Sequence, residues 1–234
     1  MKNKSEYIKF ILPLLIIFFW FIFTYTGKVP PTSLPSLSAV KDTFIEMLKS
    51  GQLSNDLSLS LRRVLAGFFI SSILGISLGI FMGISSKAKE FFQLTLTAIR
   101  QIPMIAWIPL IILWAGIGEV SKIVVILFAA TFPIVVNTMG GVDSTSETYL
   151  EVAKMYGLSK KDTFFKVYLP SALPNIFTGL RLGLGASWMA VVASELIASS
   201  SGIGYRLNDA RSLMRSDVVI VCMIIIGLVG LLMD

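Results

Sequence analysis

Six long apolar stretches separated by polar segments constrain the fold of this chain more than any other feature. A helix needs about 20 mostly apolar residues to cross the hydrocarbon core of a bilayer, and each stretch approaches that length. Only helices and closed β-barrels satisfy their backbone polar groups inside lipid. The stretches do not alternate between apolar and polar residues, so the sequence predicts helices. They cover residues 8–26, 64–84, 94–115, 120–140, 174–198 and 218–233.

Composition agrees with a membrane protein. Hydrophobic residues make up 55% of the 234 residues, charged residues only 15%, and the mean hydropathy is +0.80. A soluble domain of this size could not bury so much apolar surface. The chain has no histidine, and its one cysteine, Cys222, lies in an apolar stretch, which argues against a metal site or a disulfide framework. We expect an all-α membrane protein without a cofactor. Its net charge of +6 is attributed to basic residues in loops near anionic lipid headgroups and not to nucleic-acid binding.

The two ends of the chain need separate interpretation. Residues 1–25 could form a cleaved signal peptide, but the apolar run is longer than the roughly 7–15 residues of a signal core, and no small-x-small cleavage site follows. We therefore interpret it as a retained first helix. The last stretch, 218–233, would be only about 24 Å long as a helix, short of a bilayer core of about 30 Å. A start near Ser212 would supply the missing length, and the sequence also suggests a chain truncated after Asp234.

The polar connections divide the chain into an N-terminal part, 1–63, and a core of five further helices, 64–234. The N-terminal part combines the first helix with an external connection that holds a proline-rich segment and a predicted surface helix over 37–49. Short turns are expected at 85–92 and 116–121. A Ser/Gly turn and a basic amphipathic segment follow at 199–217. The longest polar connection of the core, 141–173, lies between the fourth and fifth apolar stretches.

Small residues recur at a spacing of about four in two of the apolar stretches. In lipid there is little hydrophobic drive between helices, so such stripes promote close backbone packing. We interpret them mainly as packing surfaces, along which helices could also slide or rock. The stripes are Gly67, Ser71, Gly75, Gly79 and Gly83 in one stretch, and Gly179, Gly183, Ala186, Ala190, Ser194 and Ala198 in the other.

Four residues within the apolar stretches are candidates for a transport pathway or gate: Glu195, Arg181, Trp107 and Pro103. An ionisable group costs about 2.5–3.5 kcal/mol at the centre of a membrane helix, so Arg181 and Glu195 should face partners, water or the headgroups. Pro103 frees backbone groups that a neighbour or a cavity must satisfy. For Trp107, packing or interfacial anchoring is the simpler alternative.

Glu195 itself has two interpretations. It could pair across helices with a basic group such as Arg206 or Arg211, or it could be a gate charge near the point of solute entry.

The connection 141–173 holds the most specific motif of the chain: Glu151-Val152-Ala153, then Gly157, Val167 and Leu169-Pro170. Tyr149, Val152, Ala153 and Tyr156 recur at i, i+3, i+4 and i+7, which predicts one face of a short helix. Gly157 suits a helix C-cap, where φ is positive.

A second short helix should follow this cap. Ser159 and Asp162 form a capping-box arrangement at its start. Pro170 should end it, and Pro174 should lie near the start of the next helix. The two short helices together predict a compact knob onto which a partner could dock.

This motif resembles the signature loop of the membrane subunits of binding-protein-dependent ABC importers, written E-A-A, three residues, Gly, nine residues, Ile, one residue, Leu-Pro. Val152 and Val167 are departures that keep the apolar character. The stretch 103–121 and Gly202-Ile203-Gly204-Tyr205 resemble the branch serving nitrate, sulfonate, taurine and related nutrients, and the likeness covers about 57–233. It implies a type I importer permease fold with about six transmembrane helices and a cytoplasmic coupling helix between helices 4 and 5.

The resemblance also implies partners and an orientation. Two cytoplasmic ATPase subunits would dock on the loop, where Glu151, Val152, Ala153, Gly157, Leu169 and Pro170 are the coupling residues. An extracytoplasmic binding protein would deliver the solute to a pathway formed by a homodimer of permease subunits. The loop of the family faces the cytoplasm, which places the N-terminus of this multi-pass cell-membrane protein in the cytoplasm, although Lys and Arg are balanced between the two sides.

Two other functions remain open on residues alone. A self-sufficient channel or secondary transporter should show inverted repeats with paired broken helices, or more charged spans, and neither is evident. An intramembrane enzyme needs a catalytic constellation, which isolated acids without histidine do not provide. No G-x-x-x-x-G-K-[S/T] motif occurs, so we expect ATP hydrolysis in a separate subunit and no enzyme activity here. Solute identity should rest largely with the binding protein.

Overall fold

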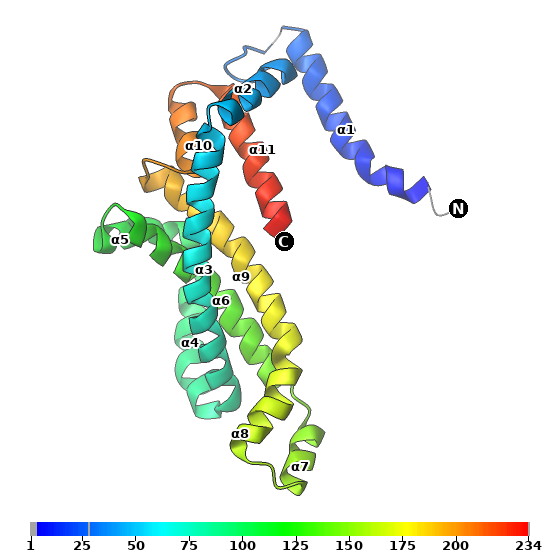
Figure 1. Ribbon diagram of the computed structural model, residues 1–234, viewed down its shortest axis with the longest axis vertical. Helices are drawn as coiled ribbons and strands as arrows, with labels where there is room; N and C mark the ends of the chain where they lie inside the picture. The colour runs from blue at the N-terminus through cyan, green and yellow to red at the C-terminus, as the bar shows by residue number, and fades with distance from the viewer. Residues whose placement is uncertain (1–3, 28, 234) are drawn as a thin grey trace.

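The computed structural model describes residues 4–27 and 29–233, with side chains from Phe10 onward, and these residues form helices and connections without a strand. Three long helices, α3, α6 and α9, run side by side along the molecule (Figure 1). Helices α7 and α8 lie at one end of this trio, α2 and α10 lie at the other, and α1 diverges from the body. The helices are α1 (Lys4–Tyr25), α2 (Leu37–Lys49), α3 (Gln52–Ile84), α4 (Ser86–Gln101), α5 (Met104–Ala115), α6 (Glu119–Asp143), α7 (Glu147–Met155), α8 (Lys160–Thr163), the π-helix η1 (Phe164–Tyr168), α9 (Leu169–Ala198), α10 (Ile203–Ser212) and α11 (Ser216–Met233).

The trio packs through the predicted small residues. Ile134 of α6 lies between Gly75 of α3 and Gly183 of α9 and is fully buried. A Cβ atom on Gly75 would lie 2.7 Å from Ile134 Cγ2, and one on Gly183 would lie 2.8 Å from Ile134 Cγ1. Both distances are below any normal contact, so glycine allows the close approach of the three backbones. The packing interpretation of the two stripes is confirmed at these positions.

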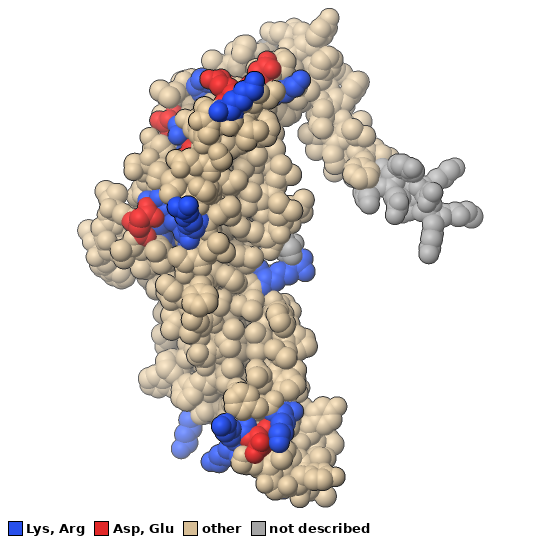
Figure 2. Space-filling model, viewed as in Figure 1, with Lys and Arg blue, Asp and Glu red and all other residues tan. Residues whose placement is uncertain are grey.

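The end of the molecule with α2 and α10 is held together by apolar packing and a few polar bonds. Helix α2, predicted over these same residues, has Ser36 as its N-cap and buries Val40 and Met47 against α11. Its Thr43 hydroxyl donates to Asp217 Oδ2 at 2.7 Å. The connection to α1 includes one indole N–H bond, from Trp20 to Pro35 O at 2.9 Å. On the face seen in Figure 2, Lys, Arg, Asp and Glu gather at the two ends and in small groups between them, and most of that face is uncharged.

Among the described residues, four helical segments are long and apolar enough to cross a membrane, and the α4–α5 pair adds a fifth if it is one broken span. The first apolar stretch is also helical, as α1. The prediction of one continuous helix over 94–115 was wrong, because α4 and α5 meet at an angle of 99° at Ile102 and Pro103. The residue before a proline is forced out of the α conformation, and Ile102 has φ −78° and ψ 121° accordingly.

Three predicted boundaries were also wrong. Helix α3 begins at Gln52 and not near 64, since an amphipathic segment extends it beyond the uniformly apolar stretch. The turn expected over 85–92 is mostly helix, because Ser85 Oγ accepts from the N–H of Ala88 and starts α4. Helix α11 begins at Ser216 and not near Ser212, because α10 ends there and Met214 turns the chain with φ 56°.

Candidate functional site

The loop between α6 and α9 folds as the predicted knob. Helix α7 ends in a Schellman motif around Gly157, which has φ +63°. The N–H of Gly157 donates to Lys154 O and the N–H of Leu158 to Ala153 O, both at 3.0 Å. These two bonds satisfy carbonyls that the helix end would otherwise leave open. The prediction of Gly157 as a C-cap in the left-handed region is therefore confirmed.

The second half of the knob differs from the prediction. Ser159 is the expected N-cap of α8: its Oγ accepts from the N–H of Asp162 at 3.1 Å and donates to the Asp162 carboxylate at 2.6 Å. Pro170 does not end this helix, however. The π-helix η1 joins α8 to α9, so Pro170 lies in the first turn of α9 and Pro174 lies inside it. Because the helix continues from η1 into α9, Pro170 and Pro174 each remove one backbone N–H from it without ending it.

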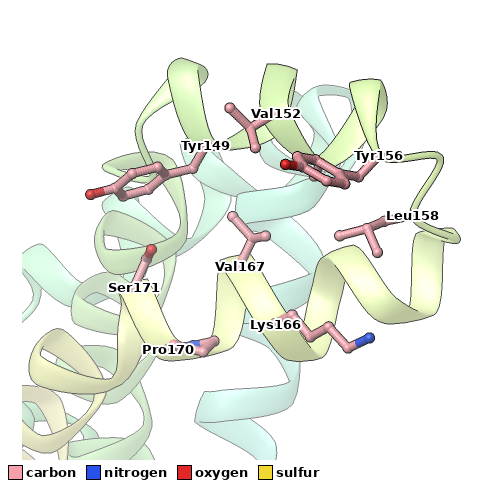
Figure 3. A pocket seen from close by; sticks show the side chains of 9 residues that line it. Tyr149, Val152, Tyr156, Leu158, Lys166, Val167, Pro170 and Ser171 are labelled. Carbon is pink, nitrogen blue, oxygen red and sulfur yellow. The ribbon is translucent and has the colours of Figure 1, made fainter.

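A groove lies between α7 and the start of α9 (Figure 3). Tyr149, Val152 and Tyr156 project from α7 on one side, and Val167 and Pro170 lie on the other. Ala153 forms part of the lining and is only 3% exposed, so α7 rests against the rest of the loop through its smallest side chain. Tyr149 is 61% exposed and Tyr156 is 82% exposed. An apolar, aromatic face of this kind at the tip of a loop is a surface suited to a partner.

The remaining coupling candidates also lie on this knob. Glu151 is exposed on α7, and Leu169 is partly buried against the cluster formed by Val142, Ala172 and Ile176. The structure therefore brings all six predicted coupling residues together, with Glu151 and Val152 accessible from outside and Ala153 and Leu169 supporting the fold of the loop.

The pathway candidate Glu195 lies near the opposite end of α9 and is 1% exposed. Its carboxylate accepts hydrogen bonds from Arg63 Nη1 at 2.6 Å, Ser60 Oγ at 2.8 Å and the N–H of Gly204 at 2.9 Å. Glu195 thus pairs across helices, and the carboxylate is buried away from any open surface.

The expected partners of Glu195 were wrong. Arg206 pairs with Asp56 of α3 at 2.9 Å, and Arg211 donates to Asn208 at 2.8 Å. Arg63 takes their place because the extension of α3 toward Gln52 carries it to the level of Glu195.

The other three pathway candidates lie apart from one another. Arg181 lines a groove between α9 and α11 together with Met189 and Leu231. Trp107 is half-buried and packs against Phe128 at 5.5 Å between ring centroids, as the packing alternative expects. Pro103 is exposed at the bend between α4 and α5 and caps α5.

Sequence reasoning missed the partners of Glu195 and Glu119. Arg63 also pairs with Glu119 at the start of α6, 56 positions away along the chain. One signal was present: Asp56, Ser60 and Arg63 recur at i, i+4 and i+7, which places three polar side chains on one helical face. This polar face contacts the end of α9 and the turn after it.

Comparison with known proteins agrees with this architecture. Residues 71–234 match the family described as "Binding-protein-dependent transport system inner membrane component". A putative ABC transporter permease protein of Methanocaldococcus jannaschii is 39% identical over 239 residues, which cover 100% of this chain and 89% of that protein. The putative aliphatic sulfonates transport permease protein SsuC of Bacillus subtilis is 38% identical, with 96% of this chain and 81% of that protein covered.

Among solved structures, a chain of an amino acid ABC transporter has a TM-score of 0.66 at 16% identity, and the match covers 81% of this chain and 93% of the other. A chain of the methionine transporter MetNI, in an inward-facing conformation, has a TM-score of 0.58 at 19% identity, with 76% and 93% covered. These structures show the shared fold, that of a type I importer permease. By its family match and by these relatives of 39% and 38% identity, the chain belongs to the inner-membrane components of binding-protein-dependent transport systems, the ABC importer permeases.

Proposed function

We propose that this chain is the permease subunit of an importer in which a separate cytoplasmic ATPase docks on the knob formed by residues 147–171. The observation that carries the proposal is the exposed aromatic face of α7 above the groove to α9. Because these side chains are exposed, packing within the chain does not account for their apolar and aromatic character. A rigid cap at Gly157 and a continuous helix from α8 into α9 would transmit motion of a docked partner to the membrane-spanning trio.

The proposed assembly is a homodimer of this chain with two ATPase subunits and an extracytoplasmic binding protein. In this arrangement the knob and the N-terminus face the cytoplasm, and α2 and α10 lie at the outer face. In Figure 1, α1 and α11 both extend from the end that holds α2 and α10 in the direction of the knob, which supports this orientation. The permease itself would catalyse no reaction, and would open a central pathway alternately to the two sides of the membrane.

The proposed solute is a small nutrient carrying an anionic group. Relatives include, besides SsuC, the nitrate import permease protein NrtB of Synechocystis, 39% identical over 75% of this chain and 64% of that protein. The taurine transport system permease protein TauC of Escherichia coli is 35% identical over 76% of this chain and 65% of that protein. Arg181, Trp107 and Pro103 remain our candidates for residues along the pathway, and Glu195 is a candidate that would act through its buried contacts.

Affinity purification of the tagged chain from its native membrane tests the docking proposal. We expect an ABC ATPase subunit to co-purify with the chain. Tyr149→Ala combined with Tyr156→Ala should remove the ATPase while leaving the chain in the membrane, because both rings are largely exposed and neither supports the core. Phe10→Ala with Phe19→Ala, exposed rings on α1, is the matched control and should retain the ATPase. Co-purification that survives loss of both tyrosines would contradict docking on this face.

A further inference from the structure

We propose that Arg63 is a positioning residue of the transport cycle, which ties the turn between α5 and α6 to the turn between α9 and α10, and that this tie opens at Glu119. The inference rests on the proposed function, because it assigns a step of alternating access to particular contacts. It concerns the end of the molecule opposite the knob, so it is independent of where the ATPase docks.

The guanidinium of Arg63 uses all its donor positions on other elements. Nε and Nη2 bind the two carboxylate oxygens of Glu119 at 2.7 and 2.6 Å. Nη1 binds Glu195 at 2.6 Å and the carbonyl of Ser201 at 2.9 Å, and Nη2 also binds Ser201 Oγ at 2.9 Å. These five bonds match the five N–H groups of an arginine. One side chain of α3 therefore joins the start of α6, the end of α9 and the turn that follows it.

The turn after α9 is the fixed side of this tie. A Cβ atom on Gly202 would lie 2.4 Å from the Glu195 carboxylate, and one on Gly204 would lie 2.6 Å from Val192 O. The N–H of Gly202 donates to Asp56 at 3.3 Å. Because the side chain of Glu195 is 0% exposed, water cannot take the place of Arg63 if the pair separates. Separation here would leave a buried charge without a partner, which is strongly unfavourable.

The turn before α6 is the releasable side. The side chain of Glu119 is 60% exposed, so water can solvate its carboxylate when Arg63 leaves. Lys122, one turn along α6, already contacts Glu119 at 3.1 Å and would keep it paired. Gly116 and Gly118 precede Glu119, and a Cβ on either would meet no atom within 4 Å. The turn before α6 therefore has free space around its glycines, whereas the turn at Gly202 is closely packed.

Movement at Glu119 does not require α3 and α6 to separate. The two helices are already in tight contact about one turn beyond Arg63 on α3 and two turns beyond Glu119 on α6, where a Cβ on Gly67 would lie 2.6 Å from Ile126 Cγ2. The mobile part is then the first turn of α6 together with α5, which is bounded by the bend at Pro103 on its other side. Both charged groups keep an oppositely charged partner in each state, Arg63 through Glu195 and Glu119 through Lys122. An element with two charge-paired arrangements is what a two-state transition needs.

Site-specific labelling of the assembled transporter tests this assignment. In a Cys222→Ser background, single cysteines replace Ile117, in the turn before α6, and Ser200, in the turn after α9; both positions are exposed. A membrane-impermeant maleimide is applied to the complex at rest and with ATP and solute-loaded binding protein. We expect the labelling rate at position 117 to change about fivefold between the two conditions, as for loss of one ion pair whose carboxylate is solvent-exposed, and that at position 200 to stay constant.

Two charge-removing substitutions complete the test. Glu119→Gln should give position 117 its active-state labelling rate already at rest, and should raise ATP hydrolysis without solute about fivefold. The matched control is Asp217→Asn, which weakens a carboxylate paired with Arg215 at the same end but outside the Arg63 contacts. It should leave both readings unchanged. A change of solute-independent hydrolysis distinguishes a positioning role from simple loss of stability, which would lower every rate.

Equal labelling changes at positions 117 and 200 would overturn the proposal, as would wild-type behaviour of Glu119→Gln. If the unmodified complex shows solute-stimulated hydrolysis but no change at position 117, the proposal fails and the proposed function stands. If the unmodified complex shows no solute-stimulated hydrolysis at all, both fail.

Discussion

Substitution of Gly157 separates the local role of this residue from its proposed role in docking. Gly157 has φ +63°, and a Cβ atom there would meet no atom of the chain within 4 Å. The cost of Gly157→Ala inside the chain is therefore backbone strain alone, about 1–2 kcal/mol for a residue with a Cβ in the left-handed region. Asparagine populates this region several-fold more readily than most residues, so Gly157→Asn should cost less.

The two substitutions lead to opposite rankings under the two roles. If glycine serves only the turn, Gly157→Asn should function better than Gly157→Ala. If a partner packs closely against position 157, the larger asparagine should be worse, since overpacking an interface costs about 1–3 kcal/mol beyond the strain. We expect Asn to be the worse substitution, and both chains to reach the membrane because the strain is confined to the loop.

Binding of the purified ATPase subunit to each variant in detergent, with solute uptake in reconstituted vesicles, measures this ranking. The account predicts ATPase binding in the order Gly, Ala, Asn. Gly157→Asn with wild-type binding and uptake would refute close docking at this position, whatever the behaviour of Gly157→Ala.

Three further predictions follow from the packing, the buried charges and the topology. Gly183→Ala should lower the free energy of unfolding of the chain in detergent by about 1–3 kcal/mol, since the added Cβ would lie 2.8 Å from Ile134. Gly227→Ala, in open space on α11, should leave the free energy of unfolding unchanged. Both Glu195→Gln and Glu119→Gln remove a carboxylate from the buried Arg63, but Glu195→Gln should destabilise the chain by about 3–5 kcal/mol because the Glu195 side chain is itself fully buried, and Glu119→Gln should cost less because the Glu119 side chain is 60% exposed and water can reach that position; equal unfolding temperatures would contradict the burial argument. Single cysteines at Lys160 and Ser200, in a Cys222→Ser background, should label from opposite sides of the membrane, and labelling from one side would exclude the proposed topology.

Local sequence signals predicted the knob and the glycine packing well. The cap at Gly157 and the N-cap at Ser159 depend on residues within one turn of each other, so their geometry follows from residue types alone. The four-residue spacing of glycines likewise fixes a narrow helical stripe, and only the identity of the neighbour, Ile134, required the structure. The predicted end of the second short helix at Pro170 was wrong, because the π-helix η1 leads directly into α9, which contains Pro170.

Long-range charge pairing could not be predicted in the same way. Arg63, Glu119 and Glu195 lie on three helices, and their proximity depends on helix lengths and crossing positions that no local pattern gives. The predicted boundary of α3 contributed to this error. A helix that begins at 64 leaves Arg63 in a connection, where a charge needs no buried partner. The bend at Pro103 had a clear local cause, but its angle of 99° depends on the packing of α5 against α6 and α9.

The most direct test of the central claim is solute uptake by reconstituted vesicles that contain this chain, with and without its ATPase subunit and a solute-loaded binding protein. The account predicts ATP-dependent uptake only when all components are present, and its loss when Tyr149 and Tyr156 on the knob are replaced by alanine. Uptake by the chain alone, or ATP-driven uptake that does not depend on the knob, would contradict the account.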